Sequence, residues 1–169
     1  PYYCRHDYAH LRRGEVAAFL KTYYNQFASL ADRQTYTFWE HFFGASPHKT
    51  HEEAWFLMQT RWMLWLEEET TLRLLPGVPR AWLAQGQAIE LNRVASYFGP
   101  LSLAVNSHVD QGWIEAAVRF HEPARQPSRV VLRLPHPRGL RARSCDGGHY
   151  DPQRETVTFI GDREVELRF

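Results

Sequence analysis

The chain has 169 residues, of which 44% are apolar and 23% charged, so its composition fits one ordinary domain or two small ones and excludes a disordered segment. Its net charge is +1 and its basic residues do not cluster, which argues against nucleic acid as a partner. No stretch approaches the roughly 20 apolar residues of a membrane span, so we expect no membrane partner. Cys4 and Cys145 are predicted to be free thiols, and we expect no metal and no cofactor.

The first half of the chain shows helical periodicity. Apolar residues at steps of three and four predict a helix over about 14–32. A second helix is predicted to begin at Thr50 and to continue to about Leu66. Apolar residues, Trp62 among them, occur around most of its circumference, so we expect this helix to be buried on several sides.

The second half is typical of β-structure, because apolar and polar residues alternate between Pro and Gly positions. This alternation predicts strands near 101–105, 114–120, 129–134, 139–144, 155–160 and 164–169. Short strands about ten residues apart indicate an antiparallel β-sandwich. The expected fold class is therefore α+β, with helices and a loop in 1–70, a Pro-punctuated crossing segment in 71–85 and the sandwich in 86–169.

The connection between the two helices, residues 33–50, carries the candidate chemistry. It is longer than most irregular connections and too rich in aromatic residues for a disordered linker. Glu40 lies among Tyr36, Trp39 and Phe43, where partial desolvation would suit a carboxylate to acid–base work. The alternative is a packing loop in which Glu40 caps a helix or pairs with an arginine.

The order of these features resembles the end of the catalytic domain in glucoamylase-like, six-hairpin glycosidases. The resemblance is carried by Trp39-Glu40, then Gly-Ala-Ser-Pro, then a helix with Trp55 near its start, and by a Leu-Leu-Pro-x-x-Pro-x-x-Trp run that begins at Leu74. It implies a bacterial protein in which the last helices of an (α/α)6 toroid are followed by a β-sandwich. It also implies a carbohydrate substrate and, as a partner, the missing N-terminal remainder of the enzyme.

The resemblance further implies residue roles. Glu40 would be the general base of an inverting hydrolysis, with the general acid on an upstream segment. Trp39 would stack on a sugar ring, Tyr36 would contact the substrate, and His48 would hydrogen-bond a hydroxyl group. The alternatives are core packing for Trp39 and a solvated or capping role for His48. A fragment that holds one carboxylate of the pair should not turn over.

Three further residues are weaker candidates. Glu52 lies in the first turn of the second helix, where the helix dipole favours a structural role. Arg61 lies inside an apolar helix and is expected to pair with a carboxylate, Glu40 being one option. His41, with His48 and Lys49, would provide anion-binding donors if the protein were a phosphorylase instead of a hydrolase.

Other functions stay open at this point. A toroidal phosphorylase or a polysaccharide lyase would keep the fold and change the reaction. A non-catalytic carbohydrate-binding or scaffold protein would use the sandwich as its binding module, although its strands carry few aromatic residues. The localisation is open as well, with a periplasmic or secreted protein among the options.

Overall fold

The computed structural model describes residues 6–40, 46 and 48–169, and this part of the chain forms three α-helices and three β-sheets. The predicted α+β class is confirmed, whereas the three helices in this part of the chain do not form the (α/α)6 toroid that the resemblance implies. The chain divides into two compact units, Pro1–Leu64 and Trp65–Phe169. The first unit carries the helices and the second carries the two large sheets.

The first unit is a helical unit with a small hairpin. Its elements are α1 (His6–Arg13), α2 (Val16–Leu30), β1 (Ala31–Asp32), β2 (Thr37–Phe38) and α3 (Thr50–Leu64). Gly14 separates α1 from α2: its φ is +77°, a left-handed value that favours glycine, and its N–H donates to the carbonyl of Leu11. The helix predicted over about 14–32 is therefore α2, which is shorter at both ends.

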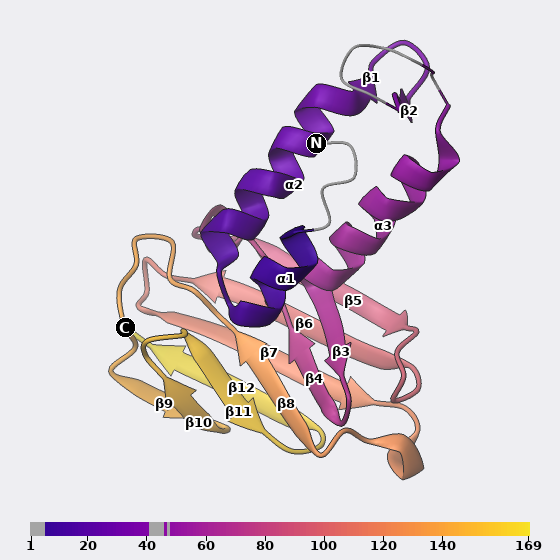
Figure 1. Cartoon of the computed structure of the whole chain (residues 1–169). Helices are drawn as coiled ribbons and strands as arrows, with labels where there is room; N and C mark the ends of the chain where they lie inside the picture. The colour runs from indigo at the N-terminus through magenta and orange to yellow at the C-terminus, as the bar shows by residue number, and fades with distance from the viewer. Residues whose placement is uncertain (1–5, 41–45, 47) are drawn as a thin grey trace. The chain divides into compact units, whose positions relative to one another are not determined.

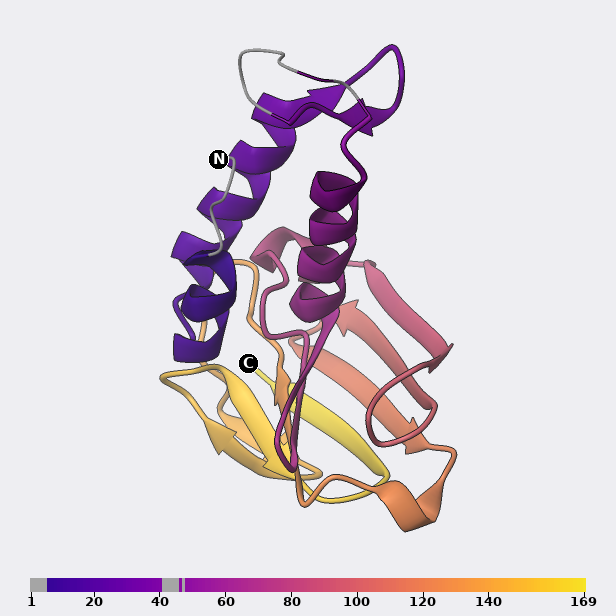
Figure 2. The ribbon, with the colours of Figure 1, turned by 45° about the vertical axis from the view of Figure 1, so that its right-hand side comes forward.

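Helices α2 and α3 lie side by side and run antiparallel (Figures 1 and 2). The ring of Phe56 stacks on Tyr23 and Phe27, with centroid distances of 5.2 and 5.4 Å. The hydroxyl groups of Tyr23 and Thr60 lie 2.9 Å apart. Residues late in α2 thus contact residues early in α3, so the pair forms a helical hairpin with the loop 31–49 at its closed end.

The burial of α3 is more one-sided than predicted. Met63 is fully buried, whereas Leu57 and Met58 are 68% and 45% exposed. Trp62 is half-buried, with its ring 4.7 Å from Tyr8 and 5.2 Å from Trp55. The apolar residues of α3 therefore pack on α1 and α2 along part of the circumference and leave another part exposed.

The second predicted helix also ends earlier than expected. Helix α3 ends at Leu64, and β3 (Trp65–Glu68) begins at once and pairs with β4 (Thr71–Leu74) in an antiparallel hairpin. The prediction of a helix to about Leu66 is wrong at this end, because a short apolar run fits a strand as well as a helix. The β-structure of the second unit accordingly starts at Trp65, before the residues predicted to form the sandwich.

The second unit is a sandwich of two five-stranded sheets (Figure 1). The remaining strands are β5 (Ala88–Val94), β6 (Leu101–His108), β7 (Trp113–Phe120), β8 (Arg129–Arg133), β9 (Ser144–Asp146), β10 (His149–Asp151), β11 (Thr156–Phe159) and β12 (Arg163–Arg168). One sheet has the order β10-β11-β8-β4-β3 and the other β5-β6-β7-β12-β9. Alternate residues of the long strands are buried, as in Leu101, Leu103 and Val105 of β6, and form the core.

Two details of the predicted sandwich are wrong. One strand pair is parallel, because β4 pairs with β8 in the register Thr71↔Arg129, whereas we predicted antiparallel pairing throughout. Residues 139–143 are not a strand: the N–H of Gly139 donates to the carbonyl of His136 in a turn, and β9 starts only at Ser144. The parallel pair arises because the chain reaches β8 from β7 in the other sheet, and not through a hairpin from β4.

A tight turn links the two sheets after β9. Gly147 has a φ of +87°, and a Cβ atom there would lie 1.9 Å from the carbonyl oxygen of Glu164. Only glycine fits so close to the backbone of β12. The chain can therefore pass from β9 in one sheet to β10 in the other within two residues, Gly147 and Gly148.

A charged network fastens the crossing segment to the sandwich. Arg133 is 8% exposed, donates to the carbonyl of Val78 at 2.9 Å and lies 3.6 Å from the carboxylate of Glu155. Burial lowers the pKa of Arg133 to about 10, and the charge of Glu155 opposes this shift. Glu155 also accepts two hydrogen bonds from Arg80, at 2.6 and 2.7 Å. Glu155 thus provides the negative charge for two arginines.

His136 lies beside this network and is 1% exposed. Its ring packs on Phe169 at a centroid distance of 4.6 Å, and its Nδ1 accepts the N–H of Arg138 at 3.0 Å. Burial lowers the pKa of His136, and the charges of Arg138 and Arg80 lower it further, against the opposing effect of Glu155. The folded chain therefore favours the neutral imidazole.

We expect Glu155→Gln to destabilise the sandwich by about 3 kcal/mol, because it leaves the buried Arg133 without a counter-charge. Glu164→Gln is the matched control, since Glu164 pairs with Arg119 at 2.6 Å but is 77% exposed; it should change the free energy of unfolding by less than about 1 kcal/mol. Urea unfolding of the two variants checks this difference. An equal loss in the free energy of unfolding for both variants would mean that burial does not strengthen the ion pairs of Glu155.

The free energy of unfolding should fall as the pH drops below about 6.5, the ordinary value for histidine. Below this pH His136 binds a proton in the unfolded chain but stays neutral in the folded chain. Its contribution to stability is therefore fully present above this pH and is lost below it. His136→Asn keeps an acceptor for the N–H of Arg138 and cannot titrate, and should flatten the profile between pH 5 and 7. Unfolding curves across this range provide the measurement, and an unchanged slope in the variant would contradict the assignment.

Candidate functional site

The loop that carries the predicted site is built on the hairpin β1–β2. Ala31 pairs with Phe38 and Asp32 with Thr37, and the N–H of Tyr36 donates to the carbonyl of Asp32 at 2.9 Å. The base of the loop is closed by the N–H of Lys49, which donates to the carbonyl of Phe38 at 3.1 Å. These contacts hold the two ends of the loop together at the end of the helical hairpin.

Glu40 is the central candidate, and its side chain is 23% exposed. Its carboxylate lies 2.9 Å from the ammonium group of Lys49, and its backbone N–H donates to the carbonyl of Ser46 at 2.9 Å. The Glu40 carboxylate therefore takes part in an ion pair across the base of the loop. The sequence predicted a carboxylate among aromatic rings and did not identify Lys49 as its partner.

Trp39 precedes Glu40 and is half-buried. Its indole N–H donates to Oδ2 of Asp32 at 3.0 Å, and its backbone N–H donates to the carbonyl of Leu30 at 2.8 Å. Asp32 was missed as a site residue by the sequence reasoning. An aspartate directly after a helix and before a turn is a recurring pattern, since its side chain accepts backbone N–H groups two and three residues on.

The carboxylate of Asp32 serves both the turn and the ring. Its Oδ1 accepts the backbone N–H groups of Gln34 and Thr35 at 2.8 and 3.0 Å. The amides of Thr35 and Gln34 hold the pKa of Asp32 below its usual value, and the indole of Trp39 adds to this effect. Asp32 therefore stays ionised at neutral pH and remains an acceptor for all three donors.

The other predicted loop residues are placed less favourably. Tyr36 lies in the hairpin turn with a φ of +57° and is 91% exposed, so it does not shield Glu40 as predicted. His48 is exposed, with a φ of +61°, and precedes Lys49. His41 and Phe43 lie outside the described residues. The structure thus brings Glu40, Lys49, Trp39 and Asp32 into contacting pairs at one loop.

The two candidates on α3 lie apart from these loop pairs. Glu52 is fully buried in the first turn of α3, where its Oε2 is 3.4 Å from the side-chain nitrogen of Gln26. Gln26 in turn accepts a hydrogen bond from Gln59 at 2.9 Å. This chain of polar groups fills the α2–α3 contact and gives Glu52 a structural environment. Arg61 is half-buried on α3.

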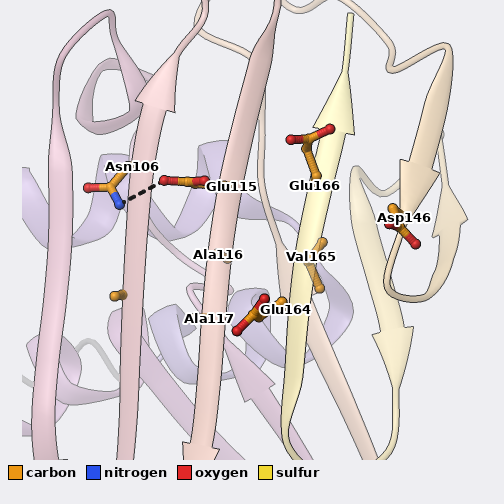
Figure 3. Close-up of a pocket in the computed structure, with 9 residues that line it drawn as sticks. Asn106, Glu115, Ala116, Ala117, Asp146, Glu164, Val165 and Glu166 are labelled. Carbon is orange, nitrogen blue, oxygen red and sulfur yellow. Dashed lines mark hydrogen bonds between the residues drawn. The ribbon is translucent and has the colours of Figure 1, made fainter.

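A hollow lies on the outer face of the sheet β5-β6-β7-β12-β9 (Figure 3). This hollow has a volume of about 380 Å³. Its lining residues are Ala104, Asn106, Glu115, Ala116, Ala117, Asp146, Glu164, Val165 and Glu166. The small side chains of the alanines leave the depression, and the carboxylate side chains lie at its edges.

Carboxylates of the hollow make hydrogen bonds or ion pairs with neighbours on the same sheet. Glu115 accepts a hydrogen bond from Asn106 at 3.2 Å, and Glu166 lies 2.6 Å from Arg168. The lining contains no aromatic ring, and the nearby Trp113 is covered by His108, at a centroid distance of 4.0 Å. A sheet-face sugar platform needs an accessible ring, so this face gives little support to the carbohydrate-binding module.

Comparisons with protein-family models, with curated proteins and with solved structures found no match to the chain. Within the described ranges, no helix is both long and apolar enough to cross a membrane. In the same part of the chain, no three or more His, Cys, Asp and Glu residues are grouped so that they could hold a metal ion. The function must therefore be argued from the geometry of the loop.

Glu52→Ala should lower the free energy of unfolding by about 1–3 kcal/mol, because it leaves the buried amide of Gln26 without its acceptor. Glu53→Ala is a matched control in the same helical turn, since Oε1 of Glu53 is buried and has no hydrogen-bond partner among the described residues. It should cost less than the Glu52 variant. Denaturant unfolding measures both, and a reversed order would show that the polar chain through Gln26 does not stabilise the α2–α3 contact.

Proposed function

We propose that the chain is the C-terminal region of a glycoside hydrolase of the six-hairpin toroid class and that Glu40 is its general base. The observation that carries the proposal is the arrangement of the loop at the closed end of the α2–α3 hairpin. There a mostly buried, ion-paired carboxylate follows directly after a tryptophan whose ring is held by Asp32. This arrangement combines a proton acceptor with a flat ring on one loop.

One local feature supports the proposal at the level of fold analogy, although the three helices described do not themselves make up a toroid. An antiparallel helical hairpin is the repeating unit of an (α/α) toroid, and α2 and α3 form such a hairpin. The loop between them carries Glu40, as the inter-helix loops of the six-hairpin glycosidases carry catalytic carboxylates. A β-sandwich follows in the chain, in the order that the resemblance implies.

The chemistry assigned to Glu40 is the activation of water. In an inverting hydrolysis one carboxylate accepts a proton from the attacking water while a carboxylic acid, roughly 6.5–9.5 Å away, protonates the leaving oxygen. The Lys49 ammonium lies 2.9 Å from Glu40 and would hold its carboxylate in one orientation. Trp39 would stack on the sugar ring, and the general acid would come from another segment. No cofactor takes part in this reaction.

The ion pair also bears on the phosphorylase alternative. A phosphorylase replaces the activated water by phosphate and needs cationic donors that are available to bind it. Lys49 was one of the three donors considered for that role, and its ammonium group contacts Glu40 instead. The pairing of Glu40 with Lys49 therefore favours the hydrolase over the phosphorylase.

In the longest natural form of the protein, Glu40→Gln should lower turnover at least about 100-fold, as expected for the loss of a general base. The measurement is sugar release from a panel of maltopentaose, cellopentaose, mannopentaose and xylopentaose, with the anomer of the first product identified by NMR. Inversion of the anomer is expected. Product that forms only when phosphate is added would instead identify a phosphorylase.

Glu164→Gln is the matched control, because it removes a carboxylate from an ion pair of the sandwich. It should leave turnover unchanged. A Glu40→Gln variant with full activity and a lowered melting temperature would show that Glu40 is structural. Sugar binding by Trp65–Phe169 alone would favour the carbohydrate-binding protein over the hydrolase.

A further inference from the structure

We infer that Asp32 is a positioning residue, which holds the indole of Trp39 in place for a sugar ring. The inference rests on the proposed function, because it concerns the same loop. Asp32 lies in β1, directly after α2, and the tryptophan that it binds lies seven residues further along the chain. The contact therefore spans the hairpin and joins the end of the helix to the residue before Glu40.

The carboxylate divides its two oxygens between two tasks. Oδ1 accepts the amides of Gln34 and Thr35, which fixes the turn. Oδ2 accepts the indole N–H of Trp39 at 3.0 Å. A charged acceptor makes a stronger hydrogen bond than a neutral one, so the ring is held more firmly than by a carbonyl group. One residue thus couples the shape of the hairpin to the orientation of the ring.

A stacking tryptophan gains from such a contact for two reasons. A half-buried indole N–H needs an acceptor, and Asp32 provides it at the edge of the ring, where the N–H lies. A ring that is held in its binding orientation before the sugar arrives loses less freedom when it binds. The backbone bond from Trp39 to Leu30 fixes the same residue at its main chain. The side chain and the backbone of Trp39 are therefore both anchored to the end of α2.

The test separates the two oxygens. Asp32→Asn keeps an oxygen that accepts the amides of Gln34 and Thr35, whereas its amide nitrogen cannot accept the indole N–H of Trp39. In ¹⁵N-indole spectra of this chain, the resonance that disappears in Trp39→Phe should shift in Asp32→Asn. With the oligosaccharide that is cleaved in the Glu40 assay, KM should rise about tenfold while kcat changes little, because the lost hydrogen bond to a charged group acts on binding.

Asp151→Asn is the matched control. Asp151 accepts the amides of Gln153 and Arg154 at 2.8 and 3.2 Å, in the same kind of turn within the sandwich. It should leave both the Trp39 resonance and KM unchanged. Trp39→Phe removes the donor from the other side and should raise KM in the same way. The double variant Asp32→Asn/Trp39→Phe should have the same KM as Trp39→Phe alone. If the single Asp32 variant folds poorly, Trp39→Phe still tests the contact from the side of the donor.

Three results would overturn the inference. An unmoved indole resonance in Asp32→Asn would show that the bond to Trp39 does not form in solution. An unchanged KM with a lowered melting temperature would reduce Asp32 to a structural turn residue. A further rise in KM in the Trp39→Phe background would show that Asp32 acts through another group. Failure of the proposed function is distinct from these, because then no sugar of the panel is cleaved and the indole spectra still report the bond.

Discussion

The packing of α2 against α3 is the constraint on which the site depends. Phe56 stacks on Tyr23 and Phe27, and the buried Gln26 and Gln59 join the same contact through their amides. Aromatic stacking contributes about 0.5–1.5 kcal/mol per pair beyond area burial, and a buried amide pair is strongly specified because a shifted helix would leave both groups unsatisfied. The position of the loop that carries Glu40 follows from this registered contact.

The described part of the loop is held by charged contacts and by the buried ring of Phe38, which packs on Phe27 and Phe56. Asp32 holds the hairpin turn and the Trp39 indole, while Lys49 holds the carboxylate of Glu40. Tyr36 contributes little packing here, since most of its side chain is exposed.

The sequence predicted the elements whose pattern is sustained and local. Helix α2 and strands β6 and β7 follow one apolar period over many residues, so their type was correct and their ends were close. Trp65 and Leu66 were assigned to a helix because a two-residue apolar run carries no period of its own. The parallel pairing of β4 with β8 could not be predicted, because it joins strands more than fifty residues apart.

The same distinction explains the candidate site. Glu40 and Trp39 were visible in the sequence because a carboxylate among aromatic residues is unusual by composition alone. Asp32 and Lys49 were not, since each matters only through a partner that the path of the loop brings to it. The sandwich shows the opposite case, where Glu164 and Arg119 are paired within the sheet and Trp113 is covered by His108. Chemistry is therefore to be sought where a turn brings a carboxylate, a cation and a ring together, which is the loop between α2 and α3.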